Sequence, residues 1–396
     1  MDRVVKEMAE LKLVLAHDWL TGMRGGEKCL EPLCRQFPGA QLLTLLHEPN
    51  STSPAIERMA IRASFLQRIP GATRGYRKLL PLLPLAAESL SAGADCDLVL
   101  SFSHAVAKNV RVPEGVPHVC YCFTPMRYAW ETREQYFAGS PTSGDGALTA
   151  RVRGSVAAAR NAALDLLAAW DRRTSARVTE FVACSQTIAR RIERCYGRTS
   201  RVIFPPVDTD FYTPNRAARE DFYLCVSALV PYKRTELAIA AANRLRRRLV
   251  IIGRGPERAR LEALAGPTIE FLGWQSNEVI RERMRRCRAL LFPGEEDFGI
   301  VPVEAQACGA PVIAYGAGGA TETVLASDGA APGSGMFFEE QSSDALAAAM
   351  LRLEQTPEYC CAELARASAE RFCGPRYERE MLAVVDEFAC RSKAAG

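Results

Sequence analysis

Short apolar runs of strand length recur along the first half of the chain, separated by longer polar-patterned segments. They lie at residues 11–16, 41–46, 97–102, 118–123 and 180–184. The first run, LKLVLA, is almost wholly apolar, which is typical of a parallel strand buried on both faces. Helical segments are expected between them, at about residues 27–36, 148–170 and 187–195. This alternation predicts a doubly wound parallel sheet.

The same rhythm starts again in the second half of the chain. Strands are expected at residues 222–227, 249–252, 269–272, 289–292 and 311–314, and residues 342–396 read as helical. Between the halves, residues 205–214 (PPVDTDFYTP) are rich in proline and lack helical periodicity. We therefore predict an α/β protein with two Rossmann-like domains, 1–204 and 215–375, joined by a linker at 205–214. A length of 396 residues fits two cores better than one.

Composition narrows the class of protein further. Hydrophobic residues make up 48% of the chain and charged residues 24%, as in a globular protein, and a net charge of +4 gives no argument for nucleic acid. The 14 cysteines are scattered without a CxxC pair and only four histidines are present, so neither a zinc site nor a redox pair is indicated. No apolar run approaches the ~20 residues that span a bilayer, and MDRVVKEMAELK lacks a signal-peptide core. We expect a cytoplasmic protein, attached at most to a membrane surface.

The candidate chemistry gathers in residues 290–314, LLFPGEEDFGIVPVEAQACGAPVIA, which predict a strand, an acidic loop, a helix ending at Gly309 and another strand. Ligands in open parallel sheets bind at the carboxyl ends of strands, where this loop falls. Its carboxylates have two interpretations, a solvated cap that offsets the helix dipole or a ligand site. Glu304, eight residues after Glu296 and flanked by small apolar residues, favours the second, because a carboxylate there can bind a sugar diol. The backbone N–H groups at the helix start suit a phosphate. They belong to Phe298, Gly299 and Ile300.

This stretch resembles the retaining glycosyltransferases of family 4, which have the GT-B fold of two Rossmann-like domains facing across a cleft. The resemblance is carried by Glu296-x7-Glu304, followed by Ala305 and by Gly309-x-Pro311-Val312. It implies that Glu304 binds the ribose of a nucleotide sugar and that Glu296 lies beside the donor sugar, as a catalytic residue. It also implies that residues 376–396 form a helix that crosses back to the first domain.

Two motifs of the first domain gain a role from the same resemblance. A glycine-rich turn, TGMRGGEK, follows the first strand, and the family places such a Gly-Gly loop against the donor diphosphate, here Gly25 and Gly26. Asp18, at the end of that strand, is either a cap or a residue that faces the acceptor or donor sugar. His104 follows the strand DLVLSF and is either structural or, as in the family, a catalytic residue hydrogen-bonded to the donor sugar.

The loop after the first strand of the second domain, ALVPYKR, departs from the family pattern. The family carries an Arg and, five or six residues later, a Lys that together neutralise the diphosphate leaving group. Lys233 matches the Lys, whereas Ala228 stands where the Arg is usual. Loss of a guanidinium beside a dianion costs a few kcal/mol unless it is replaced. Arg234 is the candidate replacement, and a less active protein is the alternative.

Two further loops are assigned to the nucleotide. Gly253 belongs to the turn GRGP and is expected to approach the nucleotide, and Gly273 and Trp274 follow the next strand, where the family holds the base largely by main-chain contacts. The basic segment 281–288 is expected to be a solvated helix face.

Two segments of the first domain are candidates for acceptor recognition. The loop TPMRYAW combines a cation with aromatic rings, and Arg127, Tyr128 and Trp130 are assigned to the acceptor site. Residues 68–90 mix arginine and lysine with leucines and have two interpretations, a buried helix with a basic entrance or a patch that binds anionic headgroups. The second would present the enzyme to a lipid-linked acceptor.

The resemblance thus implies a metal-independent retaining hexosyltransferase without a cofactor, whose donor is a nucleotide diphosphate sugar. The segments HDWLTGMRGGEK and EEDFGIVPVEAQACG most resemble bacterial mannosyltransferases of polysaccharide assembly, so GDP-mannose is the expected donor. Three alternatives stay open: a UDP-sugar-dependent transferase, a GT-B nucleotide-sugar epimerase, and a catalytically silent nucleotide-sugar binding protein, which Ala228 favours.

Overall fold

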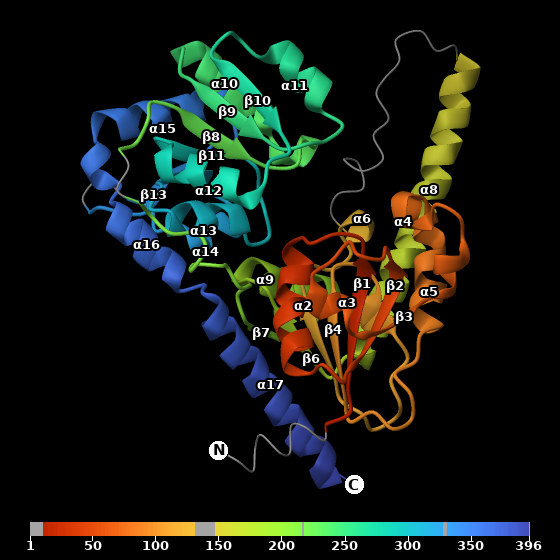
Figure 1. Ribbon diagram of the computed structural model, residues 1–396. Helices are drawn as coiled ribbons and strands as arrows, with labels where there is room; N and C mark the ends of the chain where they lie inside the picture. The colour runs from red at the N-terminus through yellow and green to blue at the C-terminus, as the bar shows by residue number, and fades with distance from the viewer. Residues whose placement is uncertain (1–10, 131–146, 216–217, 328–330, 396) are drawn as a thin grey trace. The chain divides into compact units, whose positions relative to one another are not determined.

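The computed structural model describes residues 11–130, 147–215, 218–327 and 331–395 (Figure 1). The chain divides into two compact units. Unit 1 contains the chain up to Ile203 together with the part from Glu378 onwards, and unit 2 extends from Phe204 to Tyr377.

Unit 1 is built on a parallel sheet of seven strands. The strands are β1 (Leu13–Leu20), β2 (Gln41–His47), β3 (Ala60–Ala63), β4 (Leu98–Ser103), β5 (His118–Cys122), β6 (Glu180–Ala183) and β7 (Ser200–Val202). Their order is β3-β2-β1-β4-β5-β6-β7, so the chain winds outward from β1 in one direction and returns to β4 beside it. The carboxyl ends of β1 and β4 therefore flank a topological switch point, where α/β sheets bind ligands.

Helices cover both faces of this sheet (Figure 1). They are α2 (Gly25–Gln36), α3 (Pro54–Glu57), α4 (Ala72–Gly75), α5 (Leu83–Glu88), α6 (Arg127–Trp130), α8 (Ala147–Thr174), α9 (Gln186–Tyr196) and, from Glu378, α17 (Gly374–Ala395). Helix α2 begins two residues earlier than the sequence pattern predicts. The reason is a capping box, in which the Glu27 carboxylate accepts the Arg24 N–H at 3.0 Å. Gly25 and Gly26 consequently form the first turn of α2.

Unit 2 contains a second parallel sheet, with six strands in the order β10-β9-β8-β11-β12-β13. The strands are β8 (Tyr223–Val226), β9 (Leu249–Ile252), β10 (Ile269–Gly273), β11 (Ala289–Phe292), β12 (Val312–Tyr315) and β13 (Gly335–Phe338). Alternate residues enter separate cores on the two faces, as Leu224 and Tyr223 do in β8. The predicted doubly wound α/β architecture is confirmed in both units, and the switch point of unit 2 lies between β8 and β11.

The helices of unit 2 are α10 (Thr235–Leu245), α11 (Arg258–Leu264), α12 (Asn277–Arg286), α13 (Ile300–Ala307), α14 (Ala320–Thr323), α15 (Ser343–Gln355) and α16 (Ala362–Glu370). Helix α13 ends as the sequence predicts, because Gly309 adopts φ +75°. The N–H groups of Gly309 and Ala310 then reach back to the carbonyls of Gln306 and Ala305, which is a Schellman motif.

The predicted linker and the basic segment 281–288 contact each other within unit 2. Arg285 donates to the carbonyl and hydroxyl of Thr213 at 2.6 and 2.7 Å, and the guanidinium of Arg281 lies 4.3 Å from the ring centre of Phe211. Arg366 donates to the carbonyl of Tyr212 at 2.7 Å. The prediction of a solvated basic face is therefore wrong for Arg281 and Arg285, and residues 208–213 are an integral part of unit 2.

Residues 68–90 fold into short helical turns rather than one buried helix. They include the 3-10 turn Tyr76–Leu82 and helix α5. Leu83 is fully buried, whereas Leu82 and Leu85 are 36% and 60% exposed. The side chains of Arg74, Arg77 and Lys78 lie outside the described part of the structure. Within the residues that the structure does describe, no helix has the length and apolarity needed to cross a bilayer.

Candidate active site

Asp18 and the segment after β4 form one buried assembly at the switch point of unit 1. The carboxylate of Asp18 is fully buried and accepts four backbone N–H groups. One oxygen accepts from His104 and Ala105 at 2.7 and 2.9 Å, and the other from Val106 and Ala107, both at 2.7 Å. Asp18 thus ties the segment after β4 to β1. Both of its oxygens are used, so the predicted contact with a sugar is not available to this carboxylate in the structure.

His104 is oriented by the same carboxylate. Its Nδ1 lies 3.2 Å from Asp18 Oδ2, and about a third of its side chain (32%) is exposed. Burial lowers the pKa of His104, although Asp18 opposes this, and the ring is therefore neutral near pH 7. Since a carboxylate only accepts, Nδ1 carries the proton and Nε2 keeps its lone pair. Burial would raise the pKa of Asp18, but His104 and the backbone N–H groups outweigh it and lower that pKa.

The Gly-Gly turn packs against a histidine that sequence reasoning passed over. A Cβ atom on Gly26 would lie 3.1 Å from Nε2 of His17 and 3.3 Å from the ring of Phe123. His17 is buried, its Nδ1 lies 3.1 Å from the carbonyl of Trp19, and its Nε2 has no hydrogen-bond partner among the residues that the structure describes. A glycine at position 26 therefore lets the start of α2 approach these two rings. The signal in the sequence was the histidine directly before Asp18 at a strand end.

In unit 2, the structure brings Lys233 and Glu296 together. Lys233 ends a 3-10 turn (Pro231–Lys233) after β8, Glu296 follows β11, and their side chains form an ion pair. The two loops lie close because Gly294 has no side chain: a Cβ there would lie 2.9 Å from Cα of Lys233. The pair thus occupies the β8/β11 switch point, where a ligand of an α/β sheet is expected.

Arg234 lies beside this pair but is already engaged. It adopts a left-handed conformation (φ 54°) at the start of α10, and its guanidinium pairs with Glu236 at 2.8 Å. Ala228, where the family carries Arg, is exposed. Arg234 would have to exchange Glu236 for the diphosphate in order to replace that residue.

Glu304 is 6% exposed on α13, and Tyr212, a residue of the predicted linker, is hydrogen-bonded to it. Burial and the hydrogen bond to the Glu304 carboxylate raise the pKa of Tyr212 well above its ordinary value. Sequence reasoning missed Tyr212, because nothing local shows that residues 208–213 pack against α13. The tyrosine fixes one side of a carboxylate that was expected to bind a ribose.

The start of α13 is shaped by glycines from two loops. Gly299 caps the helix at φ 85° without a side-chain cap, and Phe298 before it is buried. Ile300 is the first helical residue, so its N–H has no partner within the helix. The loop after β12 packs against this segment, and Gly319 in that loop donates its N–H to the carbonyl of Glu296 at 2.7 Å. Sequence reasoning also missed Gly319, although the string GAGG at 316–319 carries the signal.

The two loops assigned to the nucleotide meet at the carboxyl ends of β9 and β10. Gly253 donates its N–H to the carbonyl of Gly273 at 2.8 Å, and a Cβ on Gly253 would lie 1.8 Å from the carbonyl oxygen of Ser227. Trp274, next to Gly273, is 66% exposed. An exposed indole at a strand end is available for stacking.

The three residues assigned to the acceptor lie on α6, directly after the carboxyl end of β5. Trp130 is half-buried and its indole N–H donates to Asp171 at 3.0 Å. Arg127 is also half-buried, and the side chain of Tyr128 lies outside the described part of the structure. No group of three or more His, Cys, Asp or Glu side chains is placed to hold a metal ion in residues 11–130, 147–215, 218–327 and 331–395.

Two doubly wound units, each built on a parallel sheet, are the architecture of the GT-B class of transferases. Comparison with known proteins agrees. The family model described as "Glycosyltransferase Family 4" matches residues 23–211, and that described as "Glycosyl transferases group 1" matches residues 208–370. Together they cover nearly the whole chain, which belongs to the family 4 type of glycosyltransferases.

Individual relatives resemble parts of the chain. A D-inositol 3-phosphate glycosyltransferase of Mycobacteroides abscessus is 34% identical over 140 residues, which is 30% of this chain and 32% of the relative. A GDP-mannose-dependent alpha-(1-6)-phosphatidylinositol dimannoside mannosyltransferase of Mycobacterium tuberculosis is 33% identical over 149 residues, 37% of each chain. This chain thus spans about a third of the length of each of these two relatives, 32% and 37%. The solved structure of Anabaena Alr3699/HepE with UDP and glucose shares the fold, with a TM-score of 0.66, 18% identity and coverage of 94% of this chain and 98% of that one.

Proposed function

We propose that this glycosyltransferase transfers mannose from GDP-mannose to a saccharide or lipid-linked saccharide acceptor, with retention at the anomeric carbon. The observation that carries the proposal is the Lys233–Glu296 pair at the β8/β11 switch point, next to the uncapped start of α13. A cation and free N–H groups suit a diphosphate, and a carboxylate suits sugar hydroxyls. Cell-surface polysaccharide synthesis is the process in which such a transfer belongs.

The proposed chemistry needs no metal ion. As the bond to the leaving phosphate stretches, positive charge develops on the sugar and negative charge on the diphosphate. Within unit 2, Lys233 and the N–H groups of Phe298, Gly299 and Ile300 stabilise the diphosphate. His104 acts as a hydrogen-bonding group for the sugar, because its neutral ring keeps a lone pair on Nε2.

Two observations support the choice of donor and acceptor. The Mycobacterium tuberculosis relative is named as GDP-mannose-dependent and as acting on a phosphatidylinositol dimannoside. In this chain the exposed Leu82 and Leu85 lie within the segment 68–90, which suits peripheral attachment to the inner face of a membrane. A UDP-sugar is the second candidate donor, because Anabaena Alr3699/HepE was solved with UDP and glucose.

A thermal-shift panel with GDP, UDP and ADP and their sugars tests the donor. We expect GDP-mannose to raise the melting temperature most, by several degrees at saturating ligand. Glu304→Ala should abolish this shift, whereas Glu295→Ala, at an exposed position of the neighbouring loop, should keep it. A shift of equal size in the Glu304 variant would disprove the ribose assignment, and a larger shift with UDP-glucose would move the proposal to the second donor.

Transfer itself is tested with radiolabelled GDP-mannose and membrane lipids. We expect transfer to continue in the presence of EDTA and the product to keep the α configuration in NMR spectra. Reversible loss of transfer with EDTA would contradict the metal-independent chemistry. Tight donor binding without turnover on any acceptor would instead indicate the silent binding protein.

A further inference from the structure

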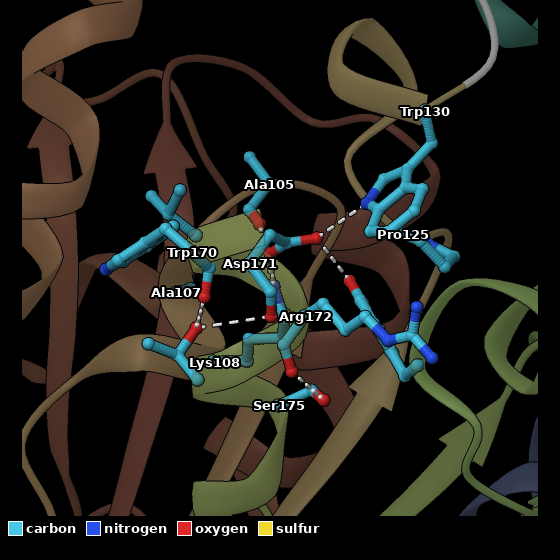
Figure 2. A network of polar contacts seen from close by, with 12 residues as sticks. Ala105, Ala107, Lys108, Pro125, Trp130, Trp170, Asp171, Arg172 and Ser175 are labelled. Carbon is cyan, nitrogen blue, oxygen red and sulfur yellow. Dashed lines mark hydrogen bonds and ion pairs between the residues drawn. The ribbon is translucent and has the colours of Figure 1, made fainter. Parts of the chain in front are cut away.

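A buried ion pair in unit 1 lies outside the chemistry proposed so far. Lys108 and Asp171 have side-chain exposures of 2% and 0%, and Lys108 donates to Oδ1 of Asp171. The other oxygen, Oδ2, accepts the hydroxyl of Tyr196 at 2.8 Å and the indole N–H of Trp130 at 3.0 Å. Figure 2 shows the indole of Trp130 turned toward this carboxylate.

Asp171 and its three partners come from four separate elements. Lys108 lies in the 3-10 turn Ala107–Asn109, Trp130 ends α6, Tyr196 ends α9, and Asp171 itself belongs to α8. A buried ion pair gains little stability over apolar side chains of the same size, because both charges lose their hydration. Its hydrogen bonds are directional, however, and fix how the elements that carry the donors are placed. Burial opposes the charge on Lys108, but Asp171 outweighs it and raises the pKa of Lys108, so the Lys108 ammonium stays charged.

Two of the elements held in this way, the 3-10 turn Ala107–Asn109 and α6, follow the carboxyl ends of the adjacent strands β4 and β5. Lys108 comes four residues after His104 and directly follows the segment that Asp18 binds. Helix α6 follows the carboxyl end of β5, next to β4 in the sheet. It has only four residues, too few to be stable by its own backbone hydrogen bonds. The indole of Trp130 therefore anchors α6 to the carboxylate that also binds Lys108, the last residue of the segment 104–108 after β4, which we call the His104 segment.

We propose that Asp171 is a positioning residue, which sets α6 against the His104 segment and thereby sets the affinity of the enzyme for its acceptor. The step to the acceptor rests on the proposed function, because it requires α6 to contact the acceptor saccharide. The placement of α6 by Asp171 is independent of the proposed function. The two parts are tested separately.

The placement is tested without turnover, by 19F NMR of the full chain labelled with 5-fluorotryptophan. The chain has four tryptophans, and Trp130→Phe assigns the resonance of Trp130. In Asp171→Asn we expect the Trp130 resonance to shift or broaden while that of Trp274, in unit 2, stays unchanged. An unchanged Trp130 resonance in a folded Asp171→Asn protein would overturn the proposal. Should that variant fail to fold, Lys108→Met/Asp171→Leu takes its place with the same expectation.

The effect on the acceptor is tested by kinetics with GDP-mannose and octyl α-D-mannopyranoside as the probe acceptor. In Trp130→Phe, which keeps an aromatic ring, we expect KM for the acceptor to rise about tenfold, with KM for the donor unchanged, because misplaced binding groups lose affinity. Asp171→Asn should show the same split, although its buried carboxyl group cannot touch the acceptor.

Two matched controls separate positioning from a general loss of stability. Trp170 lies next to Asp171 on helix α8, and its indole N–H donates to Glu88 at 3.3 Å. Trp170→Phe removes this hydrogen bond. Tyr196→Phe removes the other donor to Oδ2 of Asp171 but leaves Trp130 in place. Both should keep acceptor KM within about twofold of the parent value. Equal changes in KM in Trp130→Phe and Tyr196→Phe would show a merely structural network and overturn the proposal. Absence of transfer in the parent enzyme would contradict the proposed function instead, and the NMR result would then decide the role of Asp171.

Discussion

Asp18 shows how a single buried side chain organises the ligand edge of unit 1. Its two oxygens accept four successive backbone N–H groups, from residues 104–107, and the ring of His104 lies against the same carboxylate. A buried carboxylate costs several kcal/mol unless its lone pairs are satisfied. Here the satisfaction of that charge also determines which nitrogen of His104 carries the proton.

Asp18→Asn is expected to lower the free energy of unfolding by about 2–4 kcal/mol, because an amide nitrogen replaces an oxygen that accepts backbone N–H groups. Urea unfolding followed by circular dichroism measures the change. Asp97→Asn serves as the control, since Asp97 accepts one backbone N–H, from Lys12, at an exposed site. The control should cost less than about 1 kcal/mol. Equal losses in the two variants would contradict the structural role assigned to Asp18.

At the scale of elements, the loops after β8, β11 and β12 are fitted together by the absence of side chains. Gly294 lets the loop after β11 approach Lys233, and Gly319 lets the loop after β12 approach Phe298. Gly319 has φ −65°, a value that any residue adopts, so its requirement is purely for space. The position of Glu296 thus depends on glycines of neighbouring loops as much as on its own strand.

Gly319→Ala should therefore disturb the loop that carries Glu296. The new Cβ would lie 2.3 Å from Cα of Phe298, which is backbone and must move. We expect a loss of about 1–3 kcal/mol in stability, as for other overpacked sites, and weaker nucleotide binding in calorimetry. Gly39→Ala, where a Cβ meets nothing within 4 Å, is the control and should change neither quantity. Donor affinity at the parent level in Gly319→Ala would contradict this account of the loop.

At the scale of the molecule, stability should depend on pH through a histidine buried in β5. Burial, together with the positive charge of Lys108, lowers the pKa of His118 to about 3, and its Nε2 lies 2.8 Å from the hydroxyl of Ser101. The unfolded chain binds a proton near pH 6.5, whereas the folded chain resists it until about pH 3. His118 thus contributes stability that is complete above pH 6.5 and is lost as the pH falls toward 3. His104 acts in the same direction.

The free energy of unfolding is expected to fall between pH 6.5 and pH 4 by up to ~1.4 kcal/mol per pH unit for each such histidine. His118→Gln should flatten this dependence, because the group that titrates is gone. Ser101→Ala is the matched variant: it removes the hydrogen bond and should lower stability at every pH while keeping the slope. Urea unfolding at pH 7, 6, 5 and 4 measures both, and an unchanged slope in His118→Gln would exclude this histidine as the cause.

Local patterns in the sequence determined the class of fold and the loops where chemistry was sought. Parallel strands that are buried on both faces are almost continuously apolar, so strands such as 11–16 and 289–292 can be predicted from the sequence. The short strands β3, β7 and β13 lack such a run, and the sequence pattern did not predict them. Lys233 and Glu296 were both predicted from motifs of residues that are close together in the sequence.

Tertiary structure alone decided what the polar side chains contact. Asp18 binds residues that follow it by 86 to 89 positions, Lys108 pairs with a residue 63 positions away, and Arg285 binds one 72 positions before it. The sequence alone does not show whether a carboxylate or guanidinium faces water, a ligand or a distant part of the backbone. The difference lies in desolvation and in hydrogen-bond partners, and both are fixed only when the chain has packed.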